Sequence, residues 1–127
     1  MCKMLLSINP EFVESILKGD KLFEFRKFRC REDVDRIVIY ATAPMKVIVG
    51  EAEIDTIIED DVLNVWRQTH SYAGVSYNFF RKYYKGKKRA YAYRLKNLII
   101  YDEPQTLEEI GVSSAPQSFR YLPAVAT

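Results

Sequence analysis

The chain has 127 residues, of which 48% are hydrophobic and 28% charged, and its formal net charge is +2. This length suffices for one hydrophobic core, so we expect a single domain over residues 1–127. The apolar runs are too short for a transmembrane helix, the start of the chain does not resemble a secretory signal, and the two cysteines fit neither a metal site nor a disulfide framework. These features predict a cytoplasmic protein without a metal or cofactor. A single histidine, His70, argues against a zinc hydrolase, although it leaves a lone histidine base open.

Periodic hydrophobic patterns, bounded by Gly, Pro and capping residues, divide the chain into short elements. We expect strands over residues 5–8, 21–27, 35–42, 46–58 and 90–96, helices over residues 10–18, 62–69 and 77–85, and a helical turn over residues 106–110. Residues 98–101 should extend or follow the last strand, Pro104 should break the chain, and residues 115–127 should be extended or irregular. Gly50 interrupts its strand, which predicts a β-bulge or a bend.

The second expected strand carries the first candidate site. Its alternation places Glu24 and Arg26 on one side, opposite two phenylalanines. An acid and a guanidinium two residues apart lie close enough to bracket a polar ligand. The same spacing is typical of a solvated strand face, which is the favoured interpretation for a generic strand. Lys21 follows a tight turn at the mouth of this strand, and its position shifts the balance towards a site.

The pattern Gly19-x-Lys21-x-x-Glu24-x-Arg26 resembles the signature of ASCH domains, which belong to the PUA-like superfamily. Other segments that agree with small stand-alone ASCH proteins are Ser7-Ile8-x-Pro10, Tyr40-Ala41-Thr42-Ala43-Pro44, Gly50-Glu51, a helix with Trp66, a helix with Phe79-Phe80-x-x-Tyr83-Tyr84-x-Gly86, and Pro116-Gln117-Ser118-Phe119. The match covers almost the whole chain. The resemblance implies an α+β fold, a PUA-like pseudo-β-barrel of mostly antiparallel strands with short flanking helices.

The resemblance also implies that the cleft beside this strand holds a nucleotide, often a base taken out of its stack, so that RNA or a nucleotide is the expected partner. Glu24 would accept a hydrogen bond from an exocyclic amine, and Lys21 or Arg26 would donate to a carbonyl or a phosphate. The alternative is that Glu24 and Arg26 simply pair with each other as a structural bridge.

Further residues complete the expected ligand- or RNA-binding set. They are Ser7 and Thr42, whose hydroxyls suit the same cleft; Lys27, Lys87, Lys88 and Arg89, as cations that face phosphate; and Gln117 and Ser118, in a short polar segment of the tail. For the cations, a solvated turn is the competing interpretation.

The helix expected over residues 77–85 carries four aromatic residues among lysines and arginines: Phe79, Phe80, Tyr83 and Tyr84. Aromatic side chains among cations suit single-stranded nucleic acid. Their helical spacing is more typical of core packing, so we assign these aromatics mainly to structure.

The expected function is therefore an RNA-binding or modified-nucleotide-binding module with a polar cleft. The alternative is a small hydrolase of the family, either similar to an N-acetylcytidine amidohydrolase or a ribonuclease, with Lys21 and Glu24 in acid–base roles. Lys21 matches the family's lysine, whereas Glu24 stands where those enzymes have threonine, and no carboxylate lies in the helix near Tyr77. A regulatory domain that binds a protein partner also fits the segregation of basic residues 81–89 from acidic residues 51–61.

Overall fold

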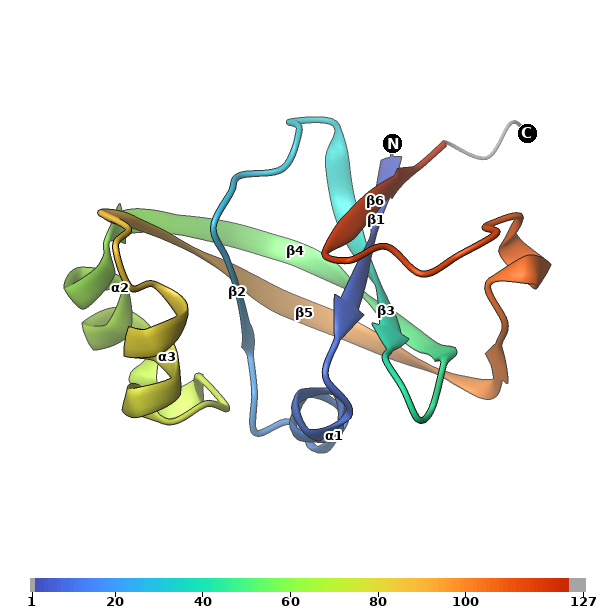
Figure 1. The fold of residues 1–127 in the computed structure, drawn as a ribbon, viewed down its shortest axis with the longest axis horizontal. Helices are drawn as coiled ribbons and strands as arrows, with labels where there is room; N and C mark the ends of the chain where they lie inside the picture. Colours follow the sequence, from blue (N-terminus) through green and yellow to red (C-terminus); the bar gives the residue numbers. More distant parts are fainter. Residues whose placement is uncertain (1, 124–127) are drawn as a thin grey trace.

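The computed structural model of the chain describes residues 2–123, which form one six-stranded sheet with short helices around it (Figure 1). The strands are β1 (Cys2–Ile8), β2 (Phe23–Arg26), β3 (Val34–Ala41), β4 (Val47–Asp61), β5 (Arg89–Gln105) and β6 (Phe119–Leu122). The helices are α1 (Pro10–Lys18), α2 (Val62–Thr69) and α3 (Tyr77–Tyr83), with the 3-10 turns η1 (His70–Tyr72) and η2 (Glu108–Ile110). Among these described helices, none is long and apolar enough to cross a membrane.

The strands lie in the order β2-β5-β4-β3-β1-β6, and every neighbouring pair is antiparallel except β1 and β3. This arrangement confirms the mixed α+β class and its mostly antiparallel strands. The sheet does not close, so the expected barrel is wrong for the described residues. Closure would require the two edge strands, β2 and β6, to pair, but β2 has only four residues. The contact across this gap is made by the side chain of Arg26, which bonds to Ser7 on β1 and to Ser118 just before β6, rather than by a backbone ladder.

Gly50 lies at an irregularity in the sheet, as its sequence context predicts. The pairing register shifts between Ile39 and Tyr40 on β3 and between Ile48 and Gly50 on β4. A Cβ atom at position 50 would collide with the backbone carbonyl oxygen of Ile99. Only glycine therefore allows β5 to approach β4 this closely at the bulge.

Two elements extend beyond their expected bounds. β5 continues through Pro104, where a break was expected, because Pro104 falls between the paired residues Ile100 and Gln105 and no ladder hydrogen bond is lost there. Part of the tail forms β6, which pairs with β1 from Phe119 to Leu122. Residues 124–127 of the tail lie outside the described part of the chain.

Strand β2 lies between two groups of buried side chains. α1 packs Val13 and Ile16 beneath β1 and β3, whereas α2 and α3 cover the other end of the sheet (Figure 1). Phe25 of β2 contacts Phe80 of α3 edge to face, with 5.1 Å between the ring centroids. One face of β2 thus joins the aromatic core, and the other faces the gap towards β1.

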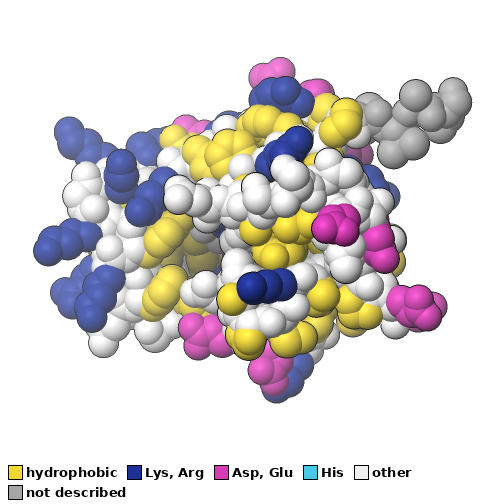
Figure 2. Space-filling model, turned by 45° about the vertical axis from the view of Figure 1, so that its right-hand side comes forward, with side chains coloured by type: hydrophobic (Ala, Val, Ile, Leu, Met, Phe, Trp, Pro, Cys, Tyr) yellow, Lys and Arg dark blue, Asp and Glu magenta, His cyan; other side chains and the backbone are white. Residues whose placement is uncertain are grey.

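Charged side chains are segregated over the surface. Figure 2 shows Lys and Arg crowded at one end of the molecule and Asp and Glu mostly elsewhere. The basic end is the one that carries α2 and α3, whose sequences and the following turn contain Arg67, Arg81, Lys82 and Lys85.

Candidate functional site

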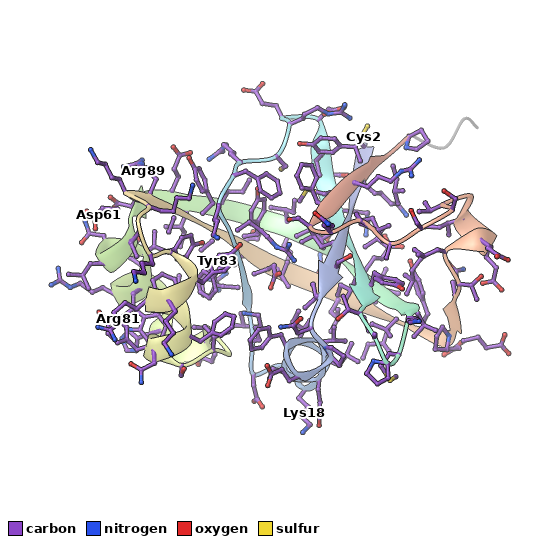
Figure 3. The ribbon with its side chains drawn as sticks, in the orientation of Figure 1. Cys2, Lys18, Asp61, Arg81, Tyr83 and Arg89 are labelled. Carbon is purple, nitrogen blue, oxygen red and sulfur yellow. The ribbon has the colours of Figure 1, made fainter. Side chains whose placement is uncertain are left out.

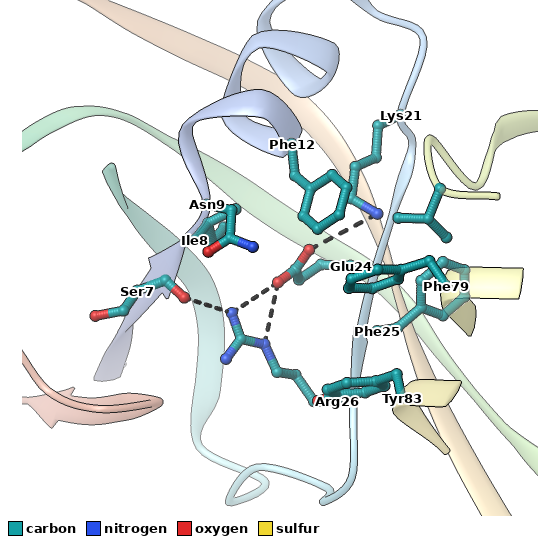
Figure 4. Close-up of a pocket in the computed structure, with 11 residues that line it drawn as sticks. Ser7, Ile8, Asn9, Phe12, Lys21, Glu24, Phe25, Arg26, Phe79 and Tyr83 are labelled. Atoms are coloured by element: carbon teal, nitrogen blue, oxygen red, sulfur yellow. Dashed lines mark hydrogen bonds and ion pairs between the residues drawn. The ribbon is translucent and has the colours of Figure 1, made fainter. Parts of the chain in front are cut away.

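A pocket of about 140 Å³ lies where the sheet stays open, between β2, the end of β1 with the start of α1, and α3 (Figure 4). Its lining residues are Ser7, Ile8, Asn9, Phe12, Lys21, Glu24, Phe25, Arg26, Val75, Phe79 and Tyr83. The structure therefore brings together four residues of the expected set, Ser7, Lys21, Glu24 and Arg26. Ser7, Asn9, Glu24 and Arg26 gather on one side of this pocket (Figure 4). The aromatic rings lie on the other side, and the Lys21 amine lies among them.

Arg26 is buried and spans the gap that the backbone leaves open. Its Nε and Nη2 donate to Glu24 Oε2 at 3.0 and 2.7 Å. The same Nη2 donates to the carbonyl oxygen of Ser7 at 2.9 Å, and Nη1 donates to the carbonyl oxygen and the hydroxyl of Ser118 at 3.3 and 3.1 Å. A guanidinium has five N–H donors, and these five hydrogen bonds occupy them. Arg26 thus holds Glu24 in place and joins β2 to β1 and to the segment before β6.

Glu24 presents one carboxylate oxygen to the protein and the other to the pocket. Oε2 accepts both hydrogen bonds from Arg26, whereas Oε1 lies 3.9 Å from Lys21 Nζ and accepts no hydrogen bond from the described residues. The carboxylate is thereby oriented by Arg26 while one oxygen stays available as an acceptor.

Lys21 is the most buried charged residue of the site, with 2% of its surface exposed. Its Nζ donates to the carbonyl oxygen of Ala73 at 2.7 Å and lies 4.8 Å from the centroid of the Phe25 ring. Burial lowers the pKa of Lys21 to about 8; the Glu24 carboxylate opposes this shift and the Arg26 guanidinium adds to it. The amine therefore changes charge within reach of neutral pH, beside an acceptor oxygen.

The loop between η1 and α3 covers Lys21. Gly74 has a φ of +67°, and a Cβ atom there would collide with the side-chain carbons of Lys21. Leu22 N also donates to the carbonyl oxygen of Tyr72 at 2.9 Å. The absence of a side chain at position 74 is what lets this loop close over the lysine.

Helix α3 divides its aromatic residues between the core and the pocket. Phe80 and Tyr84 are buried, and the Tyr84 hydroxyl donates to the carbonyl oxygen of Arg26 at 2.7 Å. Phe79 and Tyr83 line the pocket instead, with their rings parallel within 8° and their centroids 6.3 Å apart. Figure 3 shows Tyr83 pointing from α3 towards the middle of the molecule. The assignment of these aromatics to packing therefore describes only one face of α3.

Lys27 stands at the edge of the pocket, exposed, with Nζ 4.5 Å from the centroid of the Tyr83 ring. Burial raises the pKa of the Tyr83 hydroxyl. The tyrosine ring is thus covered by a cation at the rim of the pocket.

Ser7 lines the pocket, but its hydroxyl is already bonded to the tail, and the other expected polar residues lie outside the lining. Ser7 Oγ donates to the carbonyl oxygen of Pro116 at 2.6 Å, and Ser118 reaches the site only through Arg26. Thr42 and Gln117 are outside the lining of this pocket; the amide of Thr42 donates to the carbonyl oxygen of Ile8 at 3.1 Å.

The expected cations at the start of β5 do not reach the pocket either. Lys87, Lys88 and Arg89 are exposed at the basic end, and Arg89 Nη2 lies 3.5 Å from Glu59 Oε2. His70 is exposed beside Trp66, away from the pocket lining.

Sequence reasoning missed several residues of the pocket. Asn9 stands at the N-cap position of α1, but its side chain makes no capping bond within the described chain and its amide lines the pocket (Figure 4). Phe12 belongs to the apolar pattern of α1, and its ring forms part of the pocket wall. Val75 comes from a loop about 50 residues from β2, and no local pattern indicated its position.

Comparison with known proteins agrees with this architecture. A family model described as "Domain of unknown function (DUF365)" matches residues 5–116. The crystal structure of ASCH from Zymomonas mobilis is 32% identical, with a TM-score of 0.86, over 95% of this chain and 87% of that chain. An "ASCH domain-containing ribonuclease" from Zymomonas mobilis is 34% identical over 94 residues, which are 73% of this chain and 64% of that protein.

A longer relative matches as well. "Large ribosomal subunit protein uL22" from Ureaplasma parvum is 27% identical over 120 residues, which are 94% of this chain but 39% of that protein. The chain thus spans less than half the length of this relative. The family model and the similarity to the Zymomonas mobilis structure together show that the chain belongs to the ASCH domain family, in the group described as DUF365.

Proposed function

We propose that this protein binds RNA by taking up one unpaired base in the pocket between β2, α1 and α3. The observation that carries the proposal is the pair formed by Glu24 Oε1 and Lys21 Nζ, 3.9 Å apart, in a pocket with aromatic walls. A nucleobase has a flat apolar ring and an edge of donors and acceptors, and this pocket offers a partner to each.

The size of the pocket supports one ring rather than a larger ligand. A cavity of roughly 150 Å³ holds a benzene-sized molecule, and the pocket measures about 140 Å³. Phe79 and Tyr83 lie parallel within 8°, so a flat ring that enters beside them can lie parallel to both. Stacking on aromatic side chains is the usual way in which proteins hold an unstacked base.

The acceptor and the donor support recognition of a base edge. Glu24 Oε1 accepts no hydrogen bond from the described residues, and Lys21 Nζ donates only one of its three protons, to Ala73. A carboxylate accepts from an exocyclic amine, and an ammonium donates to a ring nitrogen or a carbonyl. The relative named as a ribonuclease supports RNA as the source of the base.

The test is equilibrium binding of the four nucleoside monophosphates and of a short single-stranded RNA to wild type and variants. We expect Glu24→Gln, which keeps the shape of the side chain, to weaken binding by about tenfold or more, since one good polar contact to a base contributes roughly 1–3 kcal/mol. The matched control is Glu14→Gln, which removes a carboxylate that is exposed on α1 and pairs with Lys18. Equal affinity of Glu24→Gln and wild type would overturn the proposal.

The same pair of residues favours a second candidate, hydrolysis of RNA or of an N-acylated nucleoside. A lysine whose pKa lies at about 8 is partly neutral near that pH, and Glu24 lies beside it, so the two can exchange a proton with a bound substrate. The test is to incubate the pure protein separately with RNA and with N-acetylcytidine and to measure cleavage and released cytidine. This candidate is supported if wild type forms product, Lys21→Met forms none and Lys18→Met forms product at the wild-type rate. Identical rates in the two variants remove it.

A further inference from the structure

We propose that the bound RNA is single-stranded beyond the base in the pocket, and that its next phosphates cross the outer face of α3 and are held by Arg81, Lys82 and Lys85. This proposal rests on the proposed function, because it starts the path of the strand at the pocket. It assigns a role to cations that the pocket itself does not use.

The first evidence is where the chain keeps its unpaired cations. All 19 lysines and arginines lie within residues 2–123; ten of them form ion pairs with other described residues, and nine form none within this part of the chain. Seven of these nine directly follow β2, lie on α2 or α3, or lie in the segment between α3 and β5: Lys27, Arg67, Arg81, Lys82, Lys85, Lys87 and Lys88. The remaining two are Lys46 and Arg120. Figure 2 shows the resulting concentration of basic side chains at one end of the surface.

The second evidence is a hollow that basic side chains alone surround. Arg81, Lys82 and Lys85 line a depression of about 360 Å³ on α3 and the turn that follows it. All three are exposed and form no ion pair within the described residues. Cations near the end of a helix also favour its dipole, but this effect contributes only about 0.3–1 kcal/mol and does not require a cluster. A cluster of uncompensated charges around a hollow suits a polyanion better.

The third evidence is continuity with the pocket. Tyr83, which lines the pocket, directly follows Lys82 on α3. Phe79, the other aromatic residue of α3 in the lining, stands three residues before Lys82. Residues 81–85 span roughly 6 Å along a helix axis, since each residue adds about 1.5 Å. Lys27 Nζ lies 4.5 Å from the centroid of the Tyr83 ring and adds one more exposed cation beside this pocket residue. A strand that leaves its base beside Tyr83 therefore meets the cations of α3 within the next phosphates.

A single strand fits this path better than a duplex, because its bases are already unpaired and no pairing energy is spent when one of them enters the pocket. Arginine and lysine contacts to a single-stranded backbone make the affinity depend on salt. The logarithm of the binding constant falls linearly with the logarithm of the salt concentration, with a slope of about −0.7 for each phosphate neutralised. Two cations on the path should thus contribute about −1.4 to the slope.

The experiment measures the affinity of a fluorescein-labelled 12-nucleotide RNA without self-complementarity at several salt concentrations. The test variant is Arg81→Gln/Lys82→Gln, and the matched control is Lys46→Gln/Arg120→Gln, which removes the two unpaired cations found elsewhere. We expect the test variant to lose about tenfold or more in affinity and to flatten the salt slope by about 1.4. The control should stay within about twofold of wild type, and so should the affinity of the test variant for nucleoside monophosphates.

The other outcomes overturn the proposal in ways that can be told apart. Equal RNA affinity in the test variant and the control removes the path over α3 but leaves the pocket. A loss of monophosphate binding in Arg81→Gln/Lys82→Gln shows that the substitutions act through the pocket. An RNA duplex of the same length, or vesicles containing phosphatidylserine, bound as tightly and through the same two residues, refutes a single strand as the partner. RNA binding that Glu24→Gln leaves unchanged removes the pocket and the path that starts from it.

Discussion

Replacement of Arg26 by methionine should destabilise the fold strongly, because it leaves Glu24 buried and without its partner. The two side chains are 9% and 8% exposed, and Arg26 also holds backbone or hydroxyl oxygens of Ser7 and Ser118. Loss of one partner of a buried ion pair costs about 3–5 kcal/mol. For a domain of this size, each kcal/mol lowers Tm by about 3–5 °C, so the melting temperature should fall by roughly 10–25 °C.

Urea and thermal unfolding followed by circular dichroism measure this effect against two controls. Arg29→Met removes the ion pair with Glu59, in which the arginine side chain is 51% exposed, and should cost less than about 1 kcal/mol. Glu24→Leu/Arg26→Met removes both charges of this pair and should cost less than the sum of the two single substitutions; Lys21 then loses its carboxylate neighbour but keeps its hydrogen bond to Ala73. A loss below about 1 kcal/mol for Arg26→Met, or a double variant whose loss is the sum of the single ones, would refute the role of Arg26 as the residue that joins the two sides of the gap.

Further predictions concern the lysine, its cover and the aromatic wall. The pKa of Lys21 is lowered to about 8 in the folded protein, so between that pH and roughly 10.5 the unfolded chain binds more protons than the folded one. As the pH increases through this range, the unfolding free energy of wild type should therefore rise relative to that of Lys21→Met. Chemical denaturation at several pH values measures this difference. A flat difference would contradict the burial of a charged lysine. Gly74→Ala should cost about 1–3 kcal/mol in unfolding free energy and weaken nucleotide binding, because its Cβ collides with Lys21; unchanged thermal stability would contradict this. Tyr83→Leu should lower RNA affinity by about 1–3 kcal/mol, measured against Tyr72→Leu at a tyrosine that is 54% exposed; equal losses would argue against stacking.

The alternation in β2 predicted that Glu24 and Arg26 share a face, and the structure agrees. It also suggested that this face is solvated, yet all four residues of β2 are buried. The cover comes from segments that are distant in sequence: Ser118 lies 92 residues from Arg26, and Ala73 lies 52 residues from Lys21. Local periodicity cannot report such contacts, because it describes only the two faces of one strand.

Local signals were informative where the physical cause is itself local. The left-handed conformation of Gly19 at the end of α1 and the bulge at Gly50 follow from steric requirements of one or two residues. The sequence did not predict which aromatic residues of α3 face the core and which face the pocket. A helix that is covered on one side and borders a pocket on the other shows a single apolar pattern. Which ring faces the pocket depends on where β2 and α1 lie, and this is a property of the tertiary fold.

Because β2 meets β1 through the side chain of Arg26 instead of a backbone ladder, the spacing between the two strands depends on side-chain lengths. A ladder would fix that spacing near the distance between paired strands, roughly 4.8 Å. In this domain, a substitution at Ser118, or a conservative one at Arg26 such as lysine, can change the width of the opening while the remaining strand pairs keep their register; Ser7 contributes a main-chain carbonyl, which any residue there would supply. The same scaffold can therefore admit ligands of different thickness without any change to its topology.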